Sequence, residues 1–101
     1  MPELPTITPA QLDTLPGPEW MLLDVRTDAE WAAGRIEGSV HIPLDQLIAR
    51  VDEVSDKVVC ICAVGGRSAQ ATAYLNSIGR EAVNLDGGIQ AWVAENRPLT
   101  R

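Results

Sequence analysis

Residues 57–68, Lys-Val-Val-Cys-Ile-Cys-Ala-Val-Gly-Gly-Arg-Ser, carry the clearest structural signal in this chain of 101 residues. The run from Lys57 to Cys62 is apolar and rich in β-branched side chains, which is typical of a buried strand. Two glycines follow, and from Ser68 to Ile78 apolar residues recur at helical spacing until Gly79. A buried strand that passes through a short glycine loop into a helix predicts a parallel α/β sheet.

The segments on either side of this unit repeat the alternation of strand and helix. Further short strands are predicted over residues 21–25, 39–42 and 82–85. Further helices are predicted through residues 30–33, 44–51 and 89–95. Thr27 or Asp28 is a suitable N-cap for the first of these helices, and Gly34 closes it. We therefore expect a single α/β domain over residues 1–101, with a central parallel sheet of about five short strands and helices on both faces.

The composition is that of an ordinary globular domain, with 46% hydrophobic and 22% charged residues. The net charge of −6 argues against nucleic acid and anionic membrane surfaces as partners. No apolar run approaches the ~20 residues of a transmembrane helix, and no secretory signal segment follows Met1. Two cysteines are too few for a disulfide-stapled secreted fold, so we expect a cytoplasmic protein. The oligomeric state stays open.

Cys62 lies at the carboxyl end of the predicted strand, where ligands bind in parallel α/β sheets. Gly65 and Gly66 can adopt positive φ angles, which lets successive backbone N–H groups turn inward and bind an anion. The start of the following helix adds unpaired N–H donors, and Arg67 adds a fixed positive charge. These groups favour a thiolate, so we predict that the pKa of Cys62 lies below its ordinary ~8.5 and that Cys62 is a nucleophile.

The alternative is that Cys62 is one more apolar strand residue, since buried thiols often behave as small hydrophobic groups. The Gly-Gly-Arg-Ser that follows favours the reactive interpretation. Cys60 is predicted to be buried and inert, because it lies between two apolar residues of the strand. No metal site is expected, because His41 is the one histidine of the sequence and is interpreted as structural or surface.

Three blocks of the sequence resemble the rhodanese family of sulfurtransferases. The first contains Leu22–Arg26, Glu30-Trp31 and residues 34–43, Gly-Arg-Ile-Glu-Gly-Ser-Val-His-Ile-Pro. The second, Cys62–Ser68, is similar to the family's Cys-x-x-Gly-x-Arg-Ser active-site loop. The third is residues 85–92, Leu-Asp-Gly-Gly-Ile-Gln-Ala-Trp. The blocks stand in the family's order over most of the chain, so it is identified as a single-domain rhodanese-like protein.

The resemblance implies a sulfurtransferase that needs no metal or organic cofactor. Cys62 would take a sulfane sulfur from thiosulfate or a persulfide, hold it as a persulfide and pass it to a thiol, cyanide or protein acceptor. The residues that would bind the transferred group are Ala63, Val64, Gly65, Gly66 and Arg67. Two departures stand out: Ala63 and Val64 are apolar where members that favour thiosulfate often carry basic residues, and Arg35 replaces the family's common His.

Asp24 and Arg26 end the neighbouring predicted strand and could reach the rim of the site. A structural interpretation is favoured, in which Asp24 accepts backbone N–H bonds and Arg26 pairs with Glu30 four residues on.

Two other function classes stay open. A docking or sensing module without turnover would typically lack the cysteine. A cysteine-dependent phosphatase or arsenate reductase is also related, but the phosphatase loop is one residue longer than the six residues from Cys62 to Arg67. The shorter loop favours sulfur over phosphate.

Overall fold

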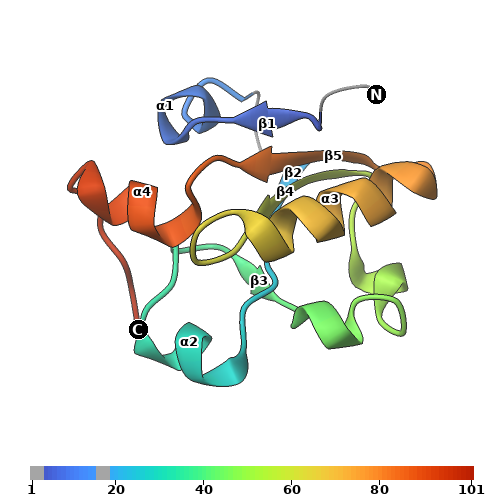
Figure 1. Cartoon of the computed structure of the whole chain (residues 1–101), viewed down its shortest axis with the longest axis horizontal. Coiled ribbons are helices and arrows are strands. Elements are labelled where there is room, and N and C mark those ends of the chain that lie inside the picture. The colour runs from blue at the N-terminus through green and yellow to red at the C-terminus, as the bar shows by residue number, and fades with distance from the viewer. Residues whose placement is uncertain (1–3, 16–18) are drawn as a thin grey trace.

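The protein has a central parallel sheet with helices on both faces, seen in a computed structural model that describes residues 4–15 and 19–101 (Figure 1). In that part of the chain the sheet has five strands in the order β1-β5-β4-β2-β3. The strands are β1 (Thr6–Ile7), β2 (Trp20–Asp24), β3 (Val40–His41), β4 (Lys57–Ile61) and β5 (Glu81–Leu85). Every pairing is parallel, so the predicted fold class is confirmed.

In the described part of the chain, three of the four helices agree with predicted positions, the first had not been predicted, and one predicted helix is absent. The four helices are α1 (Pro9–Leu12), α2 (Asp28–Ala33), α3 (Gly66–Ser77) and α4 (Gly88–Ala94). The helix predicted over residues 44–51 is wrong: the chain forms two short 3-10 helices, Leu44–Gln46 and Val51–Glu53, neither with a side-chain cap. The apolar residues of this segment, Leu44, Leu47 and Val51, still pack on the sheet, but from separate turns. Within the described residues, no helix is both long and apolar enough to cross a bilayer.

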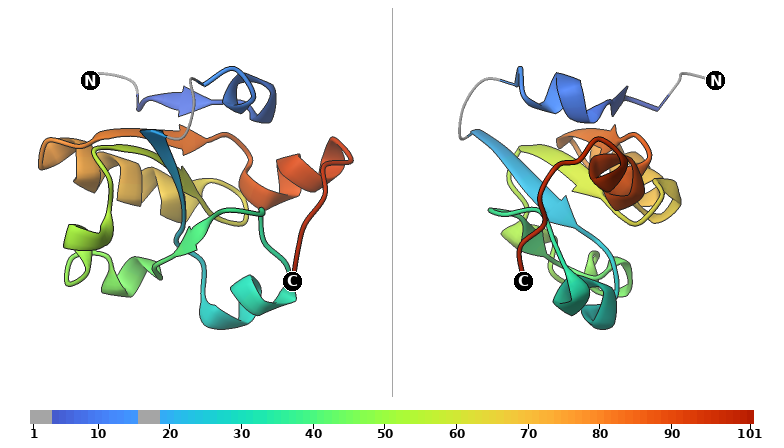
Figure 2. Two further views of the ribbon diagram at one scale, coloured as in Figure 1. Left: turned by 180° about the vertical axis from the view of Figure 1, so that it is seen from behind. Right: turned by 90° about the vertical axis from the view of Figure 1, so that its left-hand side faces the viewer.

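The two faces of the sheet carry separate hydrophobic cores, because side chains alternate along each strand. On β4, Val58 and Cys60 belong to the core under α3, whereas Val59 and Ile61 belong to the opposite core. Figure 2 shows α3 lying across one face of the sheet when the molecule is viewed from behind. Other members of the cores include Ala71, Leu75 and Leu47 on the first face and Leu12, Leu85, Ile89 and Trp92 on the second.

The parallel arrangement brings three segments together at the carboxyl edge of the sheet. Asp24 pairs in register with Ile61, and the Val25 N–H donates to the Ile61 carbonyl at 2.9 Å. The start of α4 is bonded to the segment after β4, because the Ile89 N–H donates to the carbonyl of Cys62 at 2.9 Å. The loop after β4 therefore lies between the end of β2 and the start of α4.

Candidate active site

Cys62 is the first residue after β4, and its side chain is buried under the loop that follows. The Gly65 N–H donates to the Cys62 Sγ at 2.9 Å, and the Ser68 Oγ lies 3.2 Å from the same sulfur. The chain from Cys62 to Ser68 thus curls around one sulfur atom and aims hydrogen-bonding groups at it. This is the geometry that holds a thiolate.

The loop owes its shape to Gly65. This residue is the N-cap of α3 and has a φ of +105°, a left-handed conformation that glycine adopts without strain. Gly66 differs from the prediction, because it is the first residue of α3 and has no positive φ. Ala63 is half-buried, and the Val64 side chain is 59% exposed at the loop's outer surface. One glycine therefore makes the turn and the other begins the helix.

The environments of the two cysteines move their acidities in opposite directions. Burial raises the pKa of Cys62, but hydrogen bonds from the Ser68 hydroxyl and from the N–H groups of Ser68, Gly65 and Val64 outweigh it, so the net pKa is lowered. Burial raises the pKa of Cys60 to about 11, with a smaller opposing bond from Thr72. The thiolate therefore forms more readily at Cys62 than at Cys60.

Arg67 holds an ion pair with a residue that the sequence did not assign to the site. Its two terminal nitrogens donate to the two carboxylate oxygens of Glu30, at 2.6 and 2.9 Å. The hydrogen bonds from Arg67 outweigh burial and, with those from Thr27, lower the pKa of Glu30 to about 2. The charge of Arg67 is consequently balanced by a carboxylate beside the loop.

Asp24 and Arg26 form a buried ion pair at the end of β2. The Asp24 carboxylate accepts the Arg26 backbone N–H at 3.0 Å, as expected, and also accepts the Arg26 guanidinium at 2.7 Å. The predicted pairing of Arg26 with the Glu30 side chain is wrong. Besides Asp24, the Arg26 guanidinium donates to the backbone carbonyls of Glu30 and Gly34. Burial explains why Arg26 pairs with Asp24 and not with Glu30. A buried guanidinium is costly unless an opposite charge lies in direct contact with it, and the Asp24 carboxylate is buried beside it.

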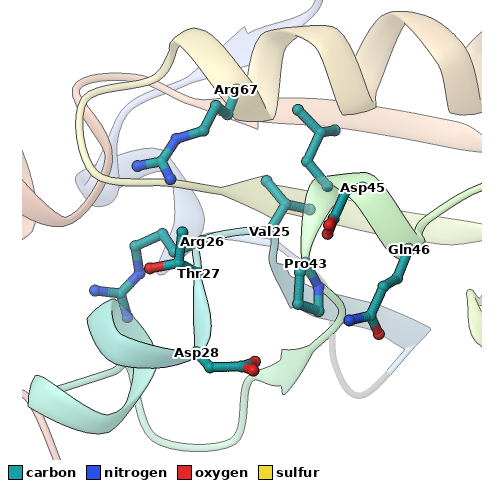
Figure 3. A pocket seen from close by; sticks show the side chains of 9 residues that line it. Val25, Arg26, Thr27, Asp28, Pro43, Asp45, Gln46 and Arg67 are labelled. Carbon is teal, nitrogen blue, oxygen red and sulfur yellow. The ribbon is translucent and has the colours of Figure 1, made fainter.

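A cavity of about 430 Å³ opens beside the cysteine loop. Figure 3 shows Arg67 reaching into it from the start of α3, with Asp28 across from it. Arg26 contributes to its wall, but Asp24 and the buried Cys62 do not. The lining residues are Val25, Arg26, Thr27, Asp28, Pro43, Leu44, Asp45, Gln46 and Arg67. A molecule that occupies this cavity touches the cysteine loop at Arg67.

Trp31, on α2, is covered by Arg35 and His41. The His41 ring stacks on the Trp31 ring with centroids 4.7 Å apart, and the Arg35 guanidinium lies 4.7 Å from that ring's centroid. The His41 Nε2 bonds to the Arg26 carbonyl at 2.7 Å. Among the described residues, no group of three or more His, Cys, Asp and Glu side chains is arranged to hold a metal ion. Of the Trp31, Arg35 and His41 side chains, His41 contacts the wall of the cavity, through the Arg26 carbonyl and Asp28.

Three polar residues complete the site beyond the predicted set: Glu30, Ser68 and Asn84. The Ser68 Oγ lies 2.5 Å from the Asn84 Oδ1, and both side chains are buried. Asn84 is a polar residue in the apolar strand β5, and that contrast is a signal available in the sequence. Glu30 carries no comparable signal, because its partner lies 37 residues away.

Comparison with known proteins finds one family. The model of the rhodanese-like domain family matches residues 8–95. A sulfurtransferase of Allochromatium vinosum is 42% identical over 82 residues, covering 78% of this chain and 77% of that protein. A thiosulfate sulfurtransferase of Pseudomonas fluorescens is 34% identical over 95 residues, covering 91% of this chain and 87% of that protein. The crystal structure of a rhodanese-related protein from Thermoplasma volcanium has a TM-score of 0.85 at 32% identity, covering 95% of this chain and 97% of that chain.

Proposed function

This chain belongs to the rhodanese-like domain family, and from that premise we propose that it is a sulfurtransferase with Cys62 as its nucleophile. The observation that carries the proposal is the pair of contacts at the Cys62 sulfur, from the Gly65 N–H at 2.9 Å and the Ser68 hydroxyl at 3.2 Å. These contacts supply the donors that a thiolate needs when it lies away from water.

The first half of the reaction loads sulfur onto the enzyme. The Cys62 thiolate attacks the outer sulfur of the donor and forms an S–S bond to it. The bond between that sulfur and the rest of the donor breaks, and its electron pair leaves with the donor remainder, as sulfite from thiosulfate or as a thiolate from a persulfide. The negative charge of the new persulfide lies on its outer sulfur, and backbone N–H groups of the surrounding loop are the donors available to stabilise it.

The second half unloads the sulfur. An acceptor thiolate, or cyanide, attacks the outer sulfur of the persulfide, and the bond to the Cys62 Sγ breaks with its electron pair returning to Cys62. The Gly65 N–H is already placed at this leaving sulfur, so the charge that develops there is met by an existing donor. No external oxidant or reductant is needed, because the sulfur moves as a neutral atom from one nucleophile to another and each leaving group keeps the electron pair of the broken bond.

The charges around the site favour a persulfide donor over free thiosulfate. Glu30 balances the charge of Arg67, and the exposed Val64 adds no cation to the loop. Two exposed carboxylates, Asp28 and Asp45, line the adjoining cavity. Both arginines that line the cavity, Arg26 and Arg67, are paired with carboxylates, so a dianion such as thiosulfate meets no uncompensated positive charge on that wall. We propose a low-molecular-weight or protein-bound persulfide as donor, and a thiol as acceptor.

Intact mass after incubation with a donor tests this function. We expect thiosulfate or a persulfide donor to add about 32 Da, one sulfur atom, to the native chain. Cys62→Ser should block the addition, whereas the matched variant Cys60→Ser should retain it. Absence of any adduct with every donor would favour a docking module. Phosphate release from an aryl phosphate, lost in Cys62→Ser, would favour the phosphatase class instead.

A further inference from the structure

The Ser68 hydroxyl group lies within hydrogen-bonding distance of two side chains, those of Cys62 and Asn84. Its Oγ is 3.2 Å from the Cys62 sulfur and 2.5 Å from the Oδ1 of Asn84. Ser68 is fully buried and Asn84 is 7% exposed, so water does not readily replace either contact. The three side chains come from different elements: the end of β4, the first turn of α3, and β5.

The orientation of the Asn84 amide follows from its other contact. Its second terminal atom lies 3.3 Å from the carbonyl oxygen of Gly65, which can only accept hydrogen bonds. That atom must therefore be the NH₂ group, and the amide oxygen must face Ser68. An oxygen in this place is an acceptor, and within the described part of the chain Ser68 supplies its side-chain hydrogen bond.

The Ser68 hydroxyl has one hydrogen for these two acceptors. If the hydrogen points to Asn84, the Ser68 Oγ turns a lone pair toward Cys62 and accepts from a neutral S–H group. If it points to a Cys62 thiolate, the buried Asn84 oxygen loses its donor. We propose that Asn84 is a positioning residue that competes with Cys62 for the Ser68 hydrogen and so restrains formation of the thiolate.

The competition changes direction during sulfur transfer, and this part of the inference rests on the proposed function. When sulfur is loaded, the Cys62 Sγ becomes an uncharged bridging atom and a weak acceptor, so the Ser68 hydrogen turns to Asn84. When the sulfur leaves, charge returns to Sγ and draws the hydrogen back. Asn84 thereby favours the loaded enzyme over the free thiolate. Within residues 4–15 and 19–101, the other charged or titratable groups that interact with Cys62 are Cys60 and Arg67.

The test measures the thiolate itself and does not depend on turnover. The rate of Cys62 alkylation by iodoacetamide is followed against pH, with the signal from Cys62→Ser subtracted. Asn84→Val, a residue suited to a strand, and Asn84→Ala should each raise the alkylation rate below the native midpoint about three- to tenfold, because Ser68 is then free to donate to the thiolate. In a Ser68→Ala background the same substitutions should have no effect.

The deciding result is whether the effect of the Asn84 substitutions depends on the presence of Ser68. An unchanged midpoint in folded Asn84 variants, or an equal shift with and without Ser68, would overturn it. The native chain offers a second measurement that needs no variant: the side-chain amide signals of Asn84 in NMR should move with the ionisation of Cys62. Asn76, whose amide is bonded to the backbone of Ala82, is the matched control. Fixed Asn84 signals would also overturn it. Failure of sulfur loading with an intact alkylation result would count against the proposed function alone.

Discussion

Glu30 on α2 and Arg67 at the start of α3 form a two-bonded ion pair, with distances of 2.6 and 2.9 Å across 37 residues of sequence. Glu30 also closes the N-terminus of its own helix, because its Oε1 accepts the Thr27 N–H at 3.0 Å. One carboxylate therefore joins a helix cap to the cysteine loop. The same contact leaves the loop's arginine without a free charge.

Glu30→Gln should improve the use of thiosulfate. Glutamine keeps an oxygen for the Thr27 N–H but removes the charge that balances Arg67, so the loop gains a net positive charge. We expect the KM for thiosulfate to fall about two- to fivefold, a modest change because the pair is one-third exposed. Glu53→Gln, which breaks the exposed Arg50 pair, is the matched control and should leave KM unchanged. A higher KM in Glu30→Gln would contradict this account.

Part of the loss of folding stability in acid should come from protonation of Glu30. Its pKa is about 2 in the folded state against an ordinary value of 4.5, so the carboxylate contributes stability above about pH 4.5 and loses it as the pH falls through 2. The free energy of unfolding of the native chain should exceed that of Glu30→Gln by a constant amount near neutral pH. Below pH 4.5 the difference should shrink. Urea titrations of both proteins at several pH values measure it, and a difference independent of pH would refute the assignment.

Asp24→Asn should destabilise the fold more than any exposed acid does. The substitution leaves the buried Arg26 guanidinium with two carbonyls but no opposite charge. We expect the free energy of unfolding to fall by about 3 kcal/mol, as for other broken buried pairs. Asp45→Asn, on the wall of the cavity and exposed, should change it by less than ~0.5 kcal/mol. Equal effects of the two substitutions in urea denaturation would contradict a structural role for Asp24.

Gly88→Ala should disturb the cysteine loop directly. A Cβ at this position would collide with the Cys62 carbonyl oxygen and come within 2.8 Å of the Ala63 carbonyl, at a φ of +56°. We expect a loss of at least ~2 kcal/mol in stability, with slower Cys62 alkylation in the protein that still folds. Gly79→Ala also has a positive φ, at +94°, but open space around it, and should cost only ~1 kcal/mol. Normal alkylation in Gly88→Ala would mean that the loop adapts.

The central unit of the fold was predictable because its signals are local. Strand β4, the glycine turn and α3 follow one another within residues 57–77, and each has a strong pattern of its own. The first strand and helix gave no such pattern, since β1 has two residues and α1 has four. A capping box between Thr8 and Gln11 marks α1 in hindsight.

The partners of charged residues were less predictable than the elements that carry them. Spacing of four residues suggested that Arg26 binds the Glu30 carboxylate, but the end of β2 places Asp24 closer to the buried guanidinium. Glu30 is then available to Arg67, which only the packing of α2 beside the loop after β4 brings within reach. The roles of Ser68 and Asn84 likewise depend on the order of strands in the sheet.

The bonds from Ile89 to Cys62 and from Gln90 to Ala63 impose an order in time on the making of this site. A ribosome adds Cys62 long before it adds the residues of α4. A nascent chain that stops short of α4 already has the Gly65 and Ser68 groups that contact the Cys62 sulfur, but it lacks the two hydrogen bonds from α4 to the carbonyls of Cys62 and Ala63. The loop after β4 therefore reaches its final geometry only when the last helix has packed against it.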